Sequence, residues 1–271
     1  MKIINLVENV PGAAGCEAAH GLSFWIETKK HCVLMDAGPS AALLLKNAGI
    51  LGIDVSKADT IVLSHGHYDH SDGLTALAGK AKIYLRKGCE ADFYSGSGDG
   101  LHYIGMAPEV KEMKQLCCLE GDCELDDELL LFGDITGRRC WPEGNRKLTV
   151  QRDGDFIQDD FSHEQCLLVR ENGKAVLFSG CAHNGILNVL ERCVEVCGKA
   201  PDAVVSGFHM KKSSSYTAEE AETIRQTAHE LLKWPCMFYT GHCTGLPAFD
   251  MMKEIMGERL TYVHCGDEVH I

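Results

Sequence analysis

The sequence predicts an α/β protein in which a mixed sheet is flanked by helices. Short apolar runs alternate with helix-like stretches along most of the chain, which is the rhythm of an α/β fold. The length of 271 residues and the hydrophobic content of 45% suit one large domain of two or three layers. We therefore expect a single domain over residues 1–271.

The first half of the chain reads as three strands, a helix, a strand, a helix and a strand. Residues 2–7 and 22–28 run apolar or alternate, and a third strand leads into Asp36-Ala37-Gly38-Pro39. Such patterns are typical of strands. The remaining expected elements are a helix at 41–48, a strand at 61–63, a helix at 74–77 and a strand within 81–88.

Residues 88–147 differ in character from the rest. They contain SGSGDG and the acidic stretch LEGDCELDDE, and only 129–132 reads as a clear short strand. Long segments without regular periods commonly form functional loops over a site. We expect an irregular insertion or cap near residues 88–147.

Regular order returns after residue 148. Asn172-Gly173 separates two apolar runs and predicts a β-hairpin. Thr217, followed three residues later by Glu220, is a capping box that predicts the start of a helix. The other expected elements are a helix at 185–198, strands that precede His209 and His242, and a closing strand from residue 260.

Composition excludes several classes of partner. The formal net charge of −13 repels phosphate backbones, so nucleic acid is not a favoured partner. No apolar run approaches the ~20 residues of a membrane span, and the first residues do not resemble a signal peptide. The fourteen Cys residues are scattered, which indicates reduced buried thiols in a cytoplasmic protein. The expected partner is a small molecule, and a homo-oligomer stays open.

The most informative stretch is IVLSHGHYDH at residues 61–70. A buried strand ends at Ser64, and one loop then presents three imidazoles and a carboxylate, which suit Zn, Fe or Mn. Alternate residues of an extended segment share a face, so His65 and His67 can hold one ion. Asp69 and His70 can serve a second, and paired ions make a hydrolytic site.

Three further histidines follow apolar strands, where α/β sheets gather their chemistry. His183, His209 and His242 each lie near Gly residues, which let the backbone approach an ion or substrate closely. Two ions need more ligands than the 65–70 cluster supplies, so these histidines are candidates for the remaining positions.

The stretch SHGHYDHSDGL resembles the HxHxDH signature of the metallo-β-lactamase superfamily, and MDAG resembles its usual strand-end Asp. GCAHNGILN, SGFHM and TGHCTG resemble the branch named for 7,8-dihydropterin-6-methyl-4-(β-D-ribofuranosyl)aminobenzene-5′-phosphate synthase. The resemblance runs from about residue 2 to 265 and is weakest across 88–147. It implies an αββα sandwich with a dinuclear site at one edge of its two sheets.

By that resemblance His65 and His67 bind the first metal, and Asp69 and His70 bind the second. Two assignments compete for the middle group. In one, His183 supplies a ligand; in the other, His163 is the third His and Cys181 is shared between the metals. We favour His183, since DDFSHEQ places His163 where this branch carries an acidic residue.

The resemblance also implies a last His on the second metal, for which we choose His242, with His209 as the second choice or as a group that faces substrate. Asp36 is expected to hold a structural hydrogen bond and to orient a ligand His. Lys211 and Lys212 are candidates for binding phosphate or carboxylate, with a solvated turn as an equal alternative.

The first functional hypothesis is a dinuclear hydrolase that attacks a small phosphoester, phosphodiester or cyclic ester with a metal-bound hydroxide. Asp69 would orient the nucleophile and carry protons. The cofactors would be two divalent ions, with Zn first and Fe or Mn as alternatives. The second hypothesis is the branch's transferase reaction, with aromatic residues from 88–147 stacking on a pterin. A diiron redox protein is the third, and His67 stands where those relatives place an acidic residue.

Overall fold

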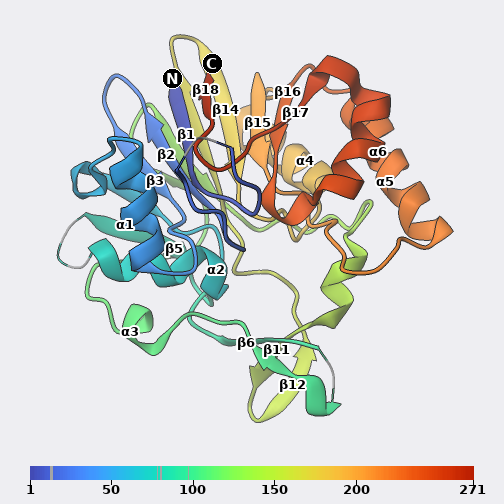
Figure 1. Ribbon diagram of the computed structural model, residues 1–271, viewed down its shortest axis with the longest axis horizontal. Coiled ribbons are helices and arrows are strands. Elements are labelled where there is room, and N and C mark those ends of the chain that lie inside the picture. Colours follow the sequence, from blue (N-terminus) through green and yellow to red (C-terminus); the bar gives the residue numbers. More distant parts are fainter. Residues whose placement is uncertain (13–14, 78, 80, 97) are drawn as a thin grey trace. The chain divides into compact units, whose positions relative to one another are not determined.

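Strands that alternate with helices build two compact units in the computed structural model (Figure 1), which describes residues 1–12, 15–77, 79, 81–96 and 98–271. The first unit comprises 1–120, 146–165 and 263–271, and the second comprises 121–145 and 166–262. Each unit has its own seven-stranded mixed sheet. The single domain over residues 1–271 stays a prediction.

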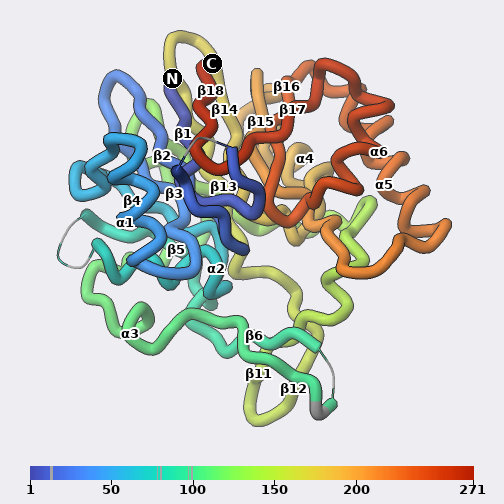
Figure 2. Tube along the Cα trace, viewed as in Figure 1, coloured from blue at the N-terminus to red at the C-terminus, as the bar shows by residue number. Residues whose placement is uncertain are grey.

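The first unit's sheet has the order β18-β1-β2-β3-β4-β5-β8. In this order, the strands from β18 to β3 pair antiparallel, and the strands from β3 to β8 pair parallel. Strand β3 therefore has one antiparallel and one parallel neighbour. The two chain ends therefore lie side by side on β1 and β18 (Figures 1 and 2). The strands are β1 (Lys2–Val7), β2 (Ser23–Glu27), β3 (Cys32–Met35), β4 (Thr60–Val62), β5 (Lys82–Arg86), β8 (Leu116–Leu119) and β18 (Glu268–His270).

Helix α1 (Ala41–Ile50) packs on this sheet and begins at Ser40, whose side chain accepts the N–H of Leu43. Its buried face joins Leu44 and Ala48 to one core with Leu34. Burying a Leu side chain contributes about 1.5–3 kcal/mol, so these contacts fix the sheet whose strand ends carry the candidate ligands. The short helices α2 (Tyr68–Ser71) and α3 (Pro108–Lys111) complete this unit.

A four-stranded antiparallel sheet in the first unit joins segments far apart in the sequence (Figure 2). Strands β6 (Asp92–Ser95) and β7 (His102–Tyr103) pair with each other, and β6 also pairs with β11 (Leu148–Arg152). Strand β12 (Asp155–Gln158) closes it. The expected insertion at 88–147 thus contributes strands to three sheets, including β8, and its role as a cap stays a prediction.

The second unit's sheet has the order β17-β16-β15-β14-β13-β10-β9. The four strands β14 to β17 pair parallel, so their carboxyl ends lie along one edge. The strands are β9 (Cys123–Glu124), β10 (Leu129–Phe132), β13 (Cys166–Glu171), β14 (Lys174–Ser179), β15 (Ala203–Ser206), β16 (Met237–Thr240) and β17 (Leu260–Tyr262). Helices α4 (Ile186–Cys197), α5 (Ala218–Leu231) and α6 (Leu246–Met256) pack on this sheet.

Several local predictions are confirmed. Asn172-Gly173 connects β13 and β14 as a hairpin, and α5 begins with the predicted capping box of Thr217 and Glu220. The short strand at 129–132 is β10. Within the described ranges, no helix combines the length and apolar character that crossing a bilayer requires.

Candidate functional site

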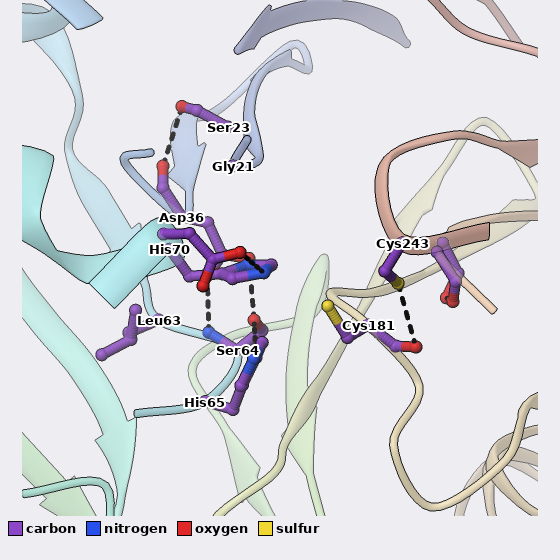
Figure 3. A network of polar contacts seen from close by, with 12 residues as sticks. Gly21, Ser23, Asp36, Leu63, Ser64, His65, His70, Cys181 and Cys243 are labelled. Atoms are coloured by element: carbon purple, nitrogen blue, oxygen red, sulfur yellow. Dashed lines mark hydrogen bonds and ion pairs between the residues drawn. The ribbon is translucent and has the colours of Figure 1, made fainter. Parts of the chain in front are cut away.

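The first group of candidate residues follows β3 and β4 in the first unit. These strands are parallel neighbours, with Met35 opposite Val62, so Asp36 and Ser64 emerge at the same edge. Asp36 is fully buried, and its Oδ1 accepts the backbone N–H of Ser64 at 2.7 Å. Its Oδ2 accepts the Ser64 hydroxyl at 2.7 Å and lies 2.7 Å from Nδ1 of His70 (Figure 3). The predicted structural role of Asp36 is therefore confirmed.

These contacts determine which ring nitrogen of two neutral histidines carries the hydrogen. The carboxylate of Asp36 can only accept, so Nδ1 of His70 is the donor and its Nε2 carries the lone pair. The Ser64 hydroxyl donates to Asp36 and therefore accepts from Nδ1 of His65, 2.9 Å away. His65 then also has a basic Nε2. Partners of this kind orient metal-binding imidazoles and raise their basicity.

A tight loop brings the three rings of the cluster together. The ring centroid of His65 lies 4.5 Å from that of His67 and 4.2 Å from that of His70. Gly66 makes this loop feasible, because a Cβ there would lie 2.1 Å from the carbonyl oxygen of Cys89. His67 then begins α2, which carries Asp69 and His70.

His163 is engaged at both ring nitrogens within this unit. Its Nδ1 accepts the backbone N–H of Gly66 at 3.2 Å, and its Nε2 lies 3.1 Å from Oδ2 of Asp159. The ring also packs on Phe93, with centroids 4.2 Å apart. These contacts describe a side chain that supports the 65–70 loop, which favours His183 over His163 as a candidate ligand.

His20 is a neighbour of the cluster that the sequence did not single out. Its Nε2 lies 3.3 Å from Oδ2 of Asp69, which is itself 3.8 Å from Nε2 of His70. The His20 side chain is half exposed, whereas Asp69 is buried. Nothing in the local sequence around His20 resembles a metal motif, so only the fold reveals this contact.

The second group of candidates lies in the second unit, after the carboxyl ends of β14, β15 and β16. Ligand atoms of Cys181, His183 and His209 lie within 4.8 Å of one another, and so do those of Cys181, His242 and Cys243. The parallel register, with Ser179 opposite Ser206, explains this convergence. Cys181, His183, His209 and His242, the four candidate metal ligands in the second unit, therefore lie near one another.

His183 is held like His65 and His70, but by an amide. Its Nδ1 lies 3.0 Å from Oδ1 of Asn145, whose Nδ2 donates to the His183 carbonyl at 2.7 Å. Nδ1 is therefore the donor, and Nε2 is the basic nitrogen. Asn145 is a supporting residue that sequence reasoning missed, since it lies 38 positions away.

The strand ends carry unusual backbone conformations. Asp36, Ala182, His209 and His242 have φ values of 58°, 50°, 49° and 48°. Such conformations cost non-glycine residues on the order of 1–3 kcal/mol each and concentrate at functional sites. Their recurrence at these strand ends supports a functional assignment.

Cys243 is a third residue that the sequence did not single out. Its Sγ accepts the backbone N–H of His209 at 3.2 Å. Burial acts to raise the pKa of Cys243, but hydrogen bonds from Cys181 and His209 outweigh it and lower the pKa to about 5.

Both groups have donors that suit a metal ion. Neutral imidazoles, a carboxylate and thiols are the usual ligands of Zn and related ions. Nδ1 of His209 is buried and has no hydrogen-bond partner among the described residues, so a bound ion would satisfy a polar atom that the fold otherwise leaves unsatisfied. By contrast Lys212 forms an ion pair with Glu220 at 2.6 Å, which argues against its predicted role in binding phosphate.

Two comparisons with known proteins point to one superfamily. The family model described as Metallo-beta-lactamase superfamily matches residues 17–107. The crystal structure of Tm1679, a metal-dependent hydrolase of the beta-lactamase superfamily, is 33% identical, with a TM-score of 0.83 over 100% of this chain and 99% of that one.

Two proteins of Methanocaldococcus jannaschii are also similar along almost their whole length. The uncharacterized protein MJ0448 is 27% identical over 94% of each chain. The 7,8-dihydropterin-6-methyl-4-(beta-D-ribofuranosyl)-aminobenzene-5′-phosphate synthase is 24% identical over 98% of this chain and 95% of its own. With its two mixed sheets flanked by helices and its similarity to Tm1679, the chain belongs to the metallo-β-lactamase superfamily.

Proposed function

We propose that this metal-dependent hydrolase of the β-lactamase superfamily cleaves a small phosphoester, phosphodiester or cyclic ester with two divalent ions, Zn foremost. The observation that carries the proposal is the Asp36 network, which fixes His65 and His70 with Nε2 as the basic nitrogen. Such preorganisation of two adjacent buried imidazoles serves metal binding better than it serves packing.

In this proposal His65 and His67 hold the first ion, and Asp69 and His70 hold the second. His183 and His242 complete the set, with Cys181 and His209 as further donors near them. The contact between Asn145 and His183 supports that choice, since it leaves Nε2 of His183 basic. The engagement of both ring nitrogens of His163 supports its exclusion.

When bound, two such ions lower the pKa of water towards neutrality and polarise the substrate oxygen. Asp69 is the proposed catalytic residue, because its buried carboxylate can orient the attacking water and accept its proton. The neighbouring His20 imidazole, 3.3 Å from Asp69, is half exposed and can pass that proton to solvent. Asp36 and Asn145 act through the histidines that they orient.

The test is removal and restoration of metal. The purified chain would be depleted with a chelator, and turnover of a phosphodiester, a lactone and a thioester would be followed before and after adding Zn, Mn or Fe. We expect depletion to abolish hydrolysis and a divalent ion to restore it for one ester class. The matched control is His229→Asn on the exposed face of α5, which should behave as the parent chain does. Full activity after verified depletion would refute the proposal.

A second candidate is the transferase reaction of the pterin branch, favoured by the 24% identity to the M. jannaschii synthase. Tyr94 packs edge-to-face on Tyr103 and on Phe156, with centroids 5.4 and 5.0 Å apart. Tyr103 and Phe156 are exposed, and exposed aromatic rings can stack on a pterin. Incubation with a dihydropterin and a phosphorylated ribosylaminobenzene would yield a joined product if this reaction occurs, and only hydrolysis products otherwise.

A further inference from the structure

We propose that Cys181 and Cys243 form a redox-sensitive dithiol, which a peroxide oxidises to a disulfide and which thereby controls metal binding in the second unit. The proposal rests on the proposed function in one respect, since it assigns regulation to residues beside the candidate ligands His183 and His242. The formation of the disulfide itself can be tested without any activity.

The two thiols meet although 62 positions separate them. Their Sγ atoms belong to a group of ligand atoms that lie within 4.8 Å of one another. In its thiol form Cys243 donates to the carbonyl oxygen of Cys181 at 3.5 Å (Figure 3). The sulfur atoms are therefore close enough to join after a modest rotation of the side chains.

Gly207 provides the space between them. A Cβ at this position would lie 2.4 Å from Sγ of Cys243 and 3.6 Å from Cα of Cys181. Any larger residue would therefore push the Cys243 thiol away from its partner. Both cysteines are almost fully buried, and the backbone N–H of His209 holds Sγ of Cys243 in place at 3.2 Å.

The chemistry needs only a hydroperoxide such as hydrogen peroxide. The Cys243 sulfur attacks one peroxide oxygen, the O–O bond breaks, and a sulfenic acid and one water form. The Cys181 sulfur then attacks the sulfenic sulfur, the S–O bond breaks, and a second water leaves. Two thiols are oxidised to one disulfide while one peroxide is reduced to two waters, so atoms and electrons balance.

The disulfide would affect metal binding because both cysteines lie close to candidate ligands in the sequence. Cys181 precedes His183 by two residues, and Cys243 follows His242 directly. A disulfide would tie these strand ends together and remove thiol donors from both groups of second-unit ligand atoms that contain Cys181. Because linkage is reciprocal, a bound ion should in turn disfavour oxidation of the pair.

The experiment compares the reduced full-length chain with and without Zn. Each sample would be treated with hydrogen peroxide, alkylated, digested and examined by mass spectrometry for the peptide that joins Cys181 to Cys243. We expect this peptide in metal-free protein, and formation that is at least about tenfold slower with Zn, within the usual range of coupling between sites. Zn affinity of the oxidised protein should also fall, by about tenfold or more.

Two controls keep the result decisive. Cys181→Ser and Cys243→Ser should each abolish the joined peptide. The contacting thiols Cys16 and Cys265 in the first unit are an internal reference, because Zn should not alter their oxidation. Absence of the Cys181–Cys243 peptide, or equal Zn affinity of oxidised and reduced protein, would overturn the proposal. If the reduced protein binds no metal at all, the proposed function fails, whereas the peptide still reports on the thiol pair.

Discussion

Nδ1 of His70 lies 2.7 Å from Oδ2 of Asp36, and both side chains are completely buried. Burying a carboxylate is costly unless hydrogen bonds compensate for lost solvation. Asp36 receives three such bonds, one from His70 and two from Ser64. The buried carboxylate of Asp36 therefore orients candidate metal ligands, and the hydrogen bonds that it accepts offset its lost solvation.

Replacement of Asp36 by Asn should weaken metal binding. The amide cannot accept all three hydrogen bonds with equal strength, and one of its donors would face Nδ1 of His70 or the Ser64 hydroxyl. We expect Zn affinity to fall by about 10–100-fold, measured by competition with a chromogenic chelator. Asp250→Asn on the exposed face of α6 is the matched control, and equal affinities for both variants would contradict the role of Asp36.

The two histidines that compete for the middle ligand position should respond differently to substitution. His183→Gln should lose about half of the bound metal, because an imidazole ligand is removed from one of two ions. His163→Gln should retain the metal but lose about 1–3 kcal/mol of stability, because Gly66 and Asp159 lose their buried partner. Metal content and chemical denaturation measure the two effects, and the opposite pattern would restore His163 as the ligand.

Gly66→Ala should destabilise the chain by about 1–3 kcal/mol, since the added methyl group would overpack against the Cys89 carbonyl. Gly49→Ala in α1 is the matched control. A Cβ there meets no atom within 4 Å, and Ala stabilises a helix by up to about 1 kcal/mol relative to Gly. The difference between the two denaturation midpoints tests whether the tight 65–67 loop is required.

Cys197 should be reactive near neutral pH. A hydrogen bond from Cys193 and a nearby Arg170 outweigh burial and lower the pKa of Cys197 to about 7. The thiolate therefore predominates above pH 7, and the rate of alkylation should rise with a midpoint there and fall at lower pH.

Arg170→Gln should move the alkylation midpoint of Cys197 upwards, whereas Arg152→Gln in the first unit should leave it unchanged. Cys118 serves as a comparison thiol, because burial raises its pKa. Site-resolved alkylation followed by mass spectrometry measures all three cases. If Arg170→Gln leaves the alkylation midpoint of Cys197 unchanged, the guanidinium does not stabilise the thiolate.

Local patterns account for much of what the sequence could predict. The hairpin at Asn172-Gly173, the capping box at Thr217 and the His-rich loop after β4 all depend on residues within a few positions of one another. For such features propensity and tertiary structure agree. The strand-end positions of His209 and His242 were predictable for the same reason.

Local sequence patterns could not predict contacts between residues that are far apart in the sequence. His20 approaches Asp69 across 49 positions, and Asn145 approaches His183 across 38. The division of 88–147 among three sheets depends on pairing with distant strands, as in the bonds between β6 and β11. Weak periodicity in that segment reflects short strands, whose stability comes from their partners and not from their own sequence.

The pairing of β18 with β1 has a consequence for the synthesis of this chain. Lys2 lies opposite His270, so β1 cannot pair with β18 until the residues between these two strands have been synthesised. Until then the outer edge of β1 exposes unpaired backbone groups, a state that invites pairing with other chains. Truncation just before β18 would make that transient edge permanent, and association between nascent or shortened chains is the expected hazard.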